Sequence, residues 1–113
     1  MDVNSFVDKL LVALANTELF ERISFQAEGP TVSGYAYLSE SDEIFLRVYF
    51  NETTDTIAFA LIEHKQRIWG IDRDNRRGWH LHPVDNPTQH ISISPLSVPN
   101  IIARLQEVLV MRE

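Results

Sequence analysis

The sequence predicts an α+β domain made of an N-terminal helix, an antiparallel meander of about four to six strands and a C-terminal helix. Apolar residues recur at helical spacing near both ends of the chain and alternate at strand spacing in the middle. The connections between the strand-like runs are too short for crossover helices, which favours antiparallel pairing. We expect both helices to form a single layer on one face of the sheet. Residues 1–113 are expected to form one globular domain.

The first helix is expected from about Asn4 to Thr17. Asn4 or Ser5 can cap its N-terminus, because a short polar side chain there accepts a hydrogen bond from a free backbone N–H. The segment has no basic region before its apolar part, so it is not expected to be a signal peptide. Its apolar stripe consists of Phe6, Val7, Leu10, Leu11 and Leu14.

The central part of the chain changes to strand spacing. The stretch "ERISFQAEG" alternates apolar and polar residues, and the later run that begins at Tyr35 is rich in β-branched and aromatic residues. Turn residues gather at "SESD" and "NETTD". A further turn near "HKQ" would place residues 57–63 beside residues 67–72.

The last segment returns to helical spacing. Ser97 precedes "VPNIIARLQEVLV" and is expected to cap a helix that has Pro99 in its first turn. The stripe of this helix that should face the core consists of Ile101, Ile102, Leu105, Val108 and Leu109.

The composition is typical of a globular protein, with 44% hydrophobic and 23% charged residues. The chain has no cysteine, which excludes disulfides, thiolate metal sites and a cysteine nucleophile and fits a reducing compartment. No apolar run approaches the roughly 20 residues that span a bilayer. We therefore expect a cytoplasmic location and no membrane partner.

The net charge of −6 argues against an overall basic nucleic-acid binder, but the charge is unevenly distributed. Residues 64–82 contain five basic and two acidic side chains, whereas the rest of the chain contains five basic and fourteen acidic ones. Such a local basic patch can bind a polyanion, receive an acidic partner or form an ordinary solvated face.

The stretch "DRDNRRGWHLHP" (residues 72–83) contains most of the candidate functional residues. Strand alternation places His80 and His82 on one face, where we expect both imidazoles to be exposed. It places Trp79 and Leu81 on the other face, where we expect them in the core. Two imidazoles on one face titrate near neutral pH and can act on one substrate.

Three interpretations of this stretch remain open. In the first, His80, His82 and His90 bind zinc or another borderline metal, and Asp72 or Asp74 orients an imidazole. In the second, the histidines cut RNA without a metal, because attack by the ribose 2′-hydroxyl needs a base, an acid and cationic donors to the phosphate. In the third, the stretch is a polar turn whose charges pair with one another.

The order of these residues resembles the TumE-like family of small toxins. The resemblance covers roughly residues 30–110, although His-Leu-His and a single later histidine replace the adjacent histidines that many of its members have. It implies a toxin that a separately encoded antitoxin neutralises and that cleaves RNA. The matching residues are Tyr35, Tyr37, Asp74, Asn75, His80, His82, Pro83 and His90.

We therefore expect a toxin of a toxin–antitoxin pair that acts as a small endoribonuclease without a cofactor. Its partners would be the cognate antitoxin and RNA, and a homodimer stays open. The alternatives are a metal-binding hydrolase, with a divalent metal such as zinc at the three histidines, and a non-enzymatic protein-interaction module. The expected site consists of His80, His82, His90 and Asp74 as catalytic residues and Arg73, Arg76 and Arg77 as phosphate-binding residues.

Overall fold

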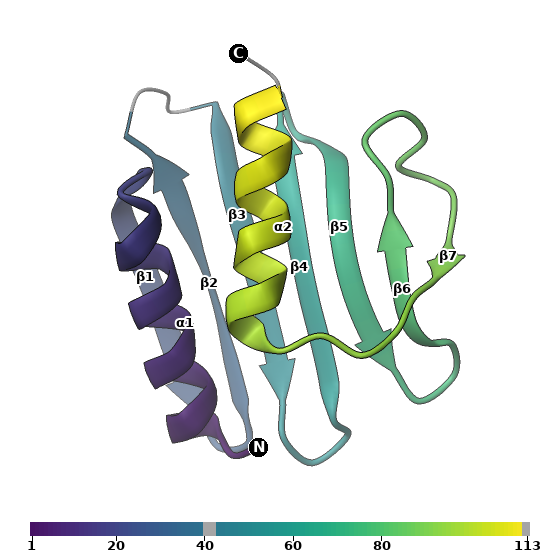
Figure 1. The fold of residues 1–113 in the computed structure, drawn as a ribbon. Helices are drawn as coiled ribbons and strands as arrows, with labels where there is room; N and C mark the ends of the chain where they lie inside the picture. The colour runs from purple at the N-terminus through teal and green to yellow at the C-terminus, as the bar shows by residue number, and fades with distance from the viewer. Residues whose placement is uncertain (40–42, 112–113) are drawn as a thin grey trace.

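The computed structural model describes residues 1–39 and 43–111 and confirms the α+β fold class. Seven strands form one antiparallel sheet in sequence order, and a helix precedes and follows them (Figure 1). The helices are α1 (Val3–Thr17) and α2 (Val98–Met111). The strands are β1 (Phe20–Glu28), β2 (Thr31–Leu38), β3 (Ile44–Asn51), β4 (Thr56–Glu63), β5 (Gln66–Asp74), β6 (Gly78–His82) and β7 (Ile91–Ser92).

The sheet has more strands than the four to six expected. Strand β7 is only two residues long, so it contains no alternation that a sequence pattern could reveal, and it is defined by its pairing with β6. The expected turn at "SESD" lies mostly outside the described residues, because positions 40–42 fall within it. None of the described helices is both long and apolar enough to cross a membrane.

The helices begin at polar caps. The side chain of Asp2, rather than Asn4 or Ser5, caps α1 by accepting a hydrogen bond of 2.8 Å from the backbone N–H of Ser5. Ser97 caps α2 as expected, since its hydroxyl accepts a hydrogen bond from the backbone N–H of Asn100.

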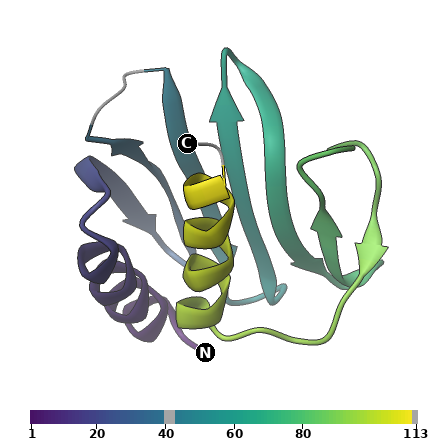
Figure 2. The same cartoon turned by 45° about the horizontal axis from the view of Figure 1, so that its top comes forward.

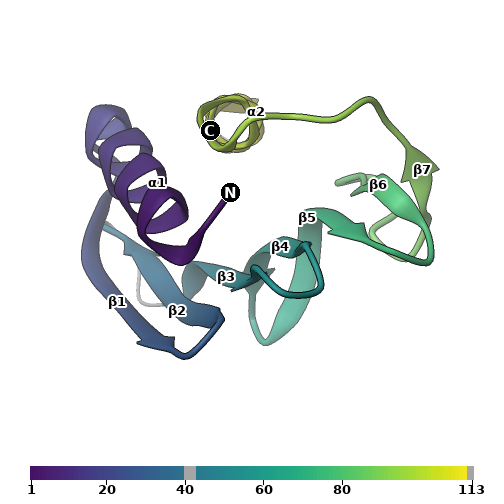
Figure 3. The ribbon, with the colours of Figure 1, turned by 90° about the horizontal axis from the view of Figure 1, so that it is seen from below.

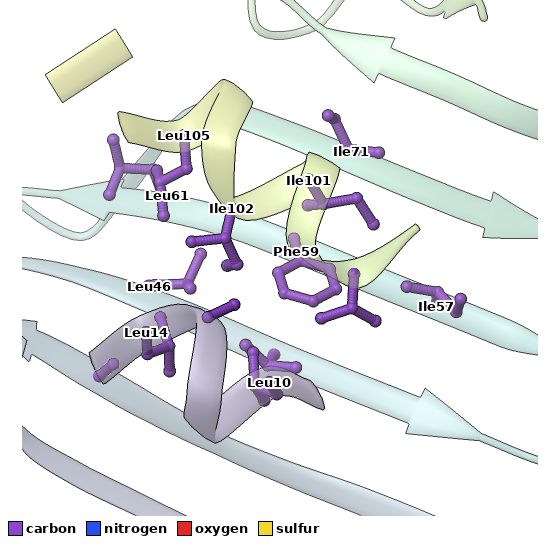
Figure 4. Packing of buried hydrophobic residues seen from close by; sticks show 14 of the residues in the cluster. Leu10, Leu14, Leu46, Ile57, Phe59, Leu61, Ile71, Ile101, Ile102 and Leu105 are labelled. Carbon is purple, nitrogen blue, oxygen red and sulfur yellow. The ribbon is translucent and has the colours of Figure 1, made fainter. Parts of the chain in front are cut away.

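Both helices cover the same face of the sheet, as expected. The sheet curves around them, so that α1 and α2 lie on its concave side (Figures 2 and 3). The apolar stripes of the helices meet the buried side chains of the central strands (Figure 4). Phe6 of α1 stacks on Phe50 of β3, with ring centroids 4.3 Å apart.

Strand register assigns each residue of the β5–β6 hairpin to a face. Leu81 lies opposite Ile71 and Trp79 opposite Arg73, and these residues point toward the helix side. Trp79 and Leu81 pack against the core, as expected, but both are only half-buried there. Helix α2 lies over β3 and β4 and does not reach β6, which explains their partial exposure (Figure 1).

The β4–β5 hairpin turns at His64 and Lys65, close to the expected position. Both residues have positive φ angles, 50° and 66°, as a type I′ turn requires. Side chains other than Asn and Gly are strained there.

We expect replacement of His64-Lys65 by Asn-Gly to stabilise the fold by about 1 kcal/mol, measured by urea unfolding. An unchanged midpoint would contradict this account of the turn.

Candidate functional site

The three candidate histidines come together on the sheet face opposite the helices. His80 lies opposite Asp72 and His82 opposite Gly70 in the β5–β6 ladder. The connection from β6 to β7 brings His90 back to the same place. The ring centroid of His90 lies 5.2 Å from that of His80 and 4.6 Å from that of His82.

His80 and His82 are buried, contrary to the expectation that they would be exposed. Their exposed fractions are 3% and 4%. The β6–β7 connection contacts them: the carbonyl oxygen of Pro87 accepts a 2.9 Å hydrogen bond from His82 Nδ1, and the ring of His90 lies beside both rings. His90, at the end of this connection, remains exposed.

The hydrogen bonds at Nδ1 define how both buried rings are held. Nδ1 of His80 lies 3.2 Å from the carbonyl oxygen of Gly78, just as Nδ1 of His82 contacts Pro87. Since a carbonyl oxygen can only accept a hydrogen bond, each Nδ1 must carry a proton. A neutral imidazole carries one proton, so each neutral ring would present the lone pair of Nε2 on its other side.

Both Nε2 atoms point at the same carboxylate oxygen. Oδ2 of Asp72 lies 3.5 Å from Nε2 of His80 and 3.1 Å from Nε2 of His82. Two lone pairs facing a carboxylate oxygen repel it, so a metal ion bound by these three atoms would relieve the repulsion. Oδ1 of Asp72 is also buried and has no hydrogen-bond partner among the described residues.

His90 adds a third nitrogen to this group. One nitrogen from each of His80, His82 and His90 lies within 4.8 Å of the others, close enough for the three to hold a metal ion. Desolvation by neighbouring groups, followed by the positive charge of Arg77, lowers the pKa of His90, which favours the neutral ring. A neutral imidazole is the form that binds a metal.

Arg77 occupies the outer side of His90. Its guanidinium lies 2.5 Å from Nε2 of His90 and can only donate, so Nε2 accepts this hydrogen bond.

Beside the histidines lies a hollow of about 520 Å³ that could admit a small substrate. It is lined by Gln66, Arg67, His82, Pro87, Thr88 and His90.

Asp74 occupies a different position from the expected one. Its Oδ1 accepts hydrogen bonds from the backbone N–H groups of Arg76 and Arg77, at 2.9 and 2.7 Å. These hydrogen bonds shape the β5–β6 turn, and they are the main cause that lowers the pKa of Asp74. The carboxylate beside the imidazoles belongs instead to Asp72, which the sequence offered only as an alternative to Asp74.

The three expected phosphate-binding arginines differ in their contacts, and only one of them lies against the histidine group. Arg73 bonds the backbone oxygen and the carboxylate of Asp55 and the side chain of Asn75, which ties β5 to the β3–β4 turn. Arg76 and Arg77 are exposed, and only Arg77 contacts the histidine group in the described part of the chain. Arg67, which the sequence did not single out, lies 3.7 Å from Asp72 and flanks the site.

Comparisons with protein families, with curated proteins and with solved structures gave no match. The resemblance to TumE-like toxins therefore stays a prediction.

Proposed function

We propose that this protein is a metal-dependent hydrolase of phosphate esters. The observation that carries the proposal is the convergence of two Nε2 atoms on Asp72, with each Nδ1 already bonded to a backbone carbonyl. In metal sites the ligating histidine characteristically donates its other N–H to a carbonyl or a carboxylate, which fixes the tautomer and the ring orientation. The proposed ligands are His80, His82, His90 and Asp72.

The donor set suits a borderline divalent metal such as zinc. Three imidazoles and a carboxylate are frequent zinc ligands, and the hollow lined by His82 and His90 lies beside them. A bound metal would polarise the phosphate oxygen and lower the pKa of a coordinated water. Hydrolysis would join the water oxygen to phosphorus and break the ester P–O bond, whose oxygen leaves with a proton.

The residues around the ligands would bind and orient the substrate. Arg77, next to His90, and Arg67, next to Asp72, are the guanidinium groups nearest to the reacting phosphate in this proposal. Guanidinium groups bind phosphate through paired hydrogen bonds. Pro87 holds His82 in place through its carbonyl oxygen.

The test combines metal binding with cleavage. Protein stripped with a chelator is titrated with zinc, manganese and nickel in a calorimeter, and we expect one equivalent of metal to bind. Labelled total RNA and a chromogenic phosphodiester are then offered to the stripped and the reloaded protein. Cleavage that needs the metal supports the proposal, whereas the absence of stoichiometric binding for all three metals would overturn it.

A second candidate function is RNA cleavage without a metal, by a cytoplasmic toxin that a cognate antitoxin neutralises. The placement of Arg77 beside the exposed His90 favours it, because a guanidinium that turns from Nε2 to a substrate phosphate would free that imidazole nitrogen to accept the 2′-hydroxyl proton. Cleavage of RNA that survives the chelator would support this candidate. Growth inhibition on expression, relieved by an adjacent gene, would support the toxin role.

Arg77 provides a separate prediction. While its guanidinium donates to Nε2, neutral His90 carries its proton on Nδ1 and has no free nitrogen for a metal. Arg77 also repels a cation. We expect Arg77→Gln to bind zinc several-fold more tightly than the wild type in a competition titration. Arg76→Gln, which removes the same charge from the adjacent exposed position, is the control. Equal or weaker binding in Arg77→Gln would contradict the competition.

A further inference from the structure

A trough crosses the sheet face opposite the helices, on strands β1–β5. Its volume is about 290 Å³, and it lies on the same face as the histidine group, closer to β1. The residues that line it are Ser24, Gln26, Ser33, Gly34, Tyr35, Arg47, Val48, Tyr49, Ala58, Ala60 and Arg67.

Strand register shows how the trough leads to the histidines. Residues directly opposite each other in neighbouring strands share a face, so the pairings define rows that run across the sheet. One row runs in the order Tyr35, Arg47, Ala60, Gly70, His82. The next row runs in the order Ser33, Tyr49, Ala58, Asp72, His80. Each row thus contains a tyrosine at its β2–β3 end, an alanine on β4 and a proposed metal ligand on β6.

The floor is low because its central positions hold small side chains. These are Ala58 and Ala60 of β4. Beyond them the side chain of Arg67, which lines both the trough and the hollow at the histidines, lies over Gly70 beside His82. At about 4.8 Å between strands, the distance along a row from β2 to β6 is about 19 Å. That length suits an extended chain rather than a single small molecule.

The wall on the β2–β3 side presents exposed aromatic rings. Tyr35 is 46% exposed and Tyr49 is 38% exposed. Tyr35 is held by edge contacts with Tyr37 and Phe45, with centroids 6.1 and 5.9 Å away, and Asn51 donates a hydrogen bond to the hydroxyl of Tyr49. Rings that are both exposed and fixed in orientation are suited to stacking against flat ligand groups.

The charge of the trough is opposite to that of the whole protein. Arg47 and Arg67 are its charged lining residues, and none of the described lining residues is acidic, although the chain carries a net charge of −6. An anionic chain would therefore be attracted to this face and repelled by most of the remaining surface.

We propose that the trough binds single-stranded nucleic acid, with bases stacked on Tyr35 and Tyr49 and phosphates held by Arg47 and Arg67. The strand crosses the sheet along the rows and brings one phosphate to the histidine group. This inference rests on the proposed function, because it names the class of substrate that the histidine group would cleave. Binding itself does not depend on the metal.

Binding is tested by fluorescence anisotropy with labelled 12-nucleotide oligo-U and oligo-dT in the presence of a chelator. We expect both to bind, with an affinity that falls as salt rises. Tyr35→Ala, Tyr49→Ala and Arg47→Gln should each weaken binding by about tenfold. Ala58→Phe should weaken it as well, because the added ring fills the floor of the trough.

Arg104→Gln on helix α2 is the matched control, since Arg104 is exposed like Arg47 but lies on the helix side. Loss of binding in Arg47→Gln but not in Arg104→Gln supports the proposal, and tighter binding of oligo-U than of oligo-dT identifies RNA as the preferred form. Equal affinities of the two variants, or no binding of either oligonucleotide by the wild type, would overturn it. Because a chelator is present, failure of the metal proposal would leave this binding unchanged. Arg47 is not a proposed metal ligand, so Arg47→Gln should bind zinc as tightly as the wild type even if it no longer binds the oligonucleotides.

Discussion

His90→Ala is expected to lower the affinity for zinc by at least about 100-fold, measured by competition with a chromophoric chelator. Loss of a hydrogen-bonding residue outside the ligand set typically lowers metal affinity 10–100-fold, and loss of a ligand should have a larger effect. His90 is exposed, so the substitution leaves no cavity in the core. The melting temperature without metal should therefore stay close to that of the wild type.

His64→Ala is the matched control for this experiment. It removes the fourth histidine of the chain, which lies exposed in the β4–β5 turn and contacts Glu43 rather than the histidine group. Asp72→Asn complements the pair, because it preserves the shape of the side chain while removing the charge at Oδ2. Wild-type zinc affinity in both His90→Ala and Asp72→Asn would exclude these residues as ligands.

Gly34→Ala is expected to destabilise the fold by about 3 kcal/mol or more, because overpacking a well-packed site typically costs 1–3 kcal/mol and here the neighbour is backbone. A Cβ atom at this position would overlap the carbonyl oxygen of Ser24 and lie 2.6 Å from Cδ1 of Phe25. The overlap with the backbone of β1 can be relieved only if β1 moves away from β2. Urea unfolding measures the effect.

Gly29→Ala separates steric overlap from backbone strain. Gly29 has a φ angle of 58°, but a Cβ atom there would meet nothing within 4 Å. Its replacement should cost only about 1 kcal/mol, the strain of a left-handed conformation. Similar losses of stability in the two variants would show that close approach of β1 is not the reason for glycine at position 34.

The sequence by itself determined the order and type of the main elements. Helical spacing marked both helices, and turn residues between alternating runs indicated an antiparallel sheet, because these patterns follow from the local geometry of a helix or a strand. The alternation in "WHLH" also correctly placed His80 and His82 on one face. Period-two spacing assigns residues to faces without any knowledge of their neighbours.

Only the tertiary structure decided which groups surround the histidines. Asp74 is nearer to them in sequence, yet Asp72 lies beside them, because the β5–β6 register pairs Asp72 with His80 while Asp74 shapes the turn. Their contacts with Pro87 and His90 likewise depend on the path of the β6–β7 connection, which has no periodic signal in the sequence. The trough depends on five strands in register, since side chains from about position 24 to position 67 become neighbours only when the sheet forms.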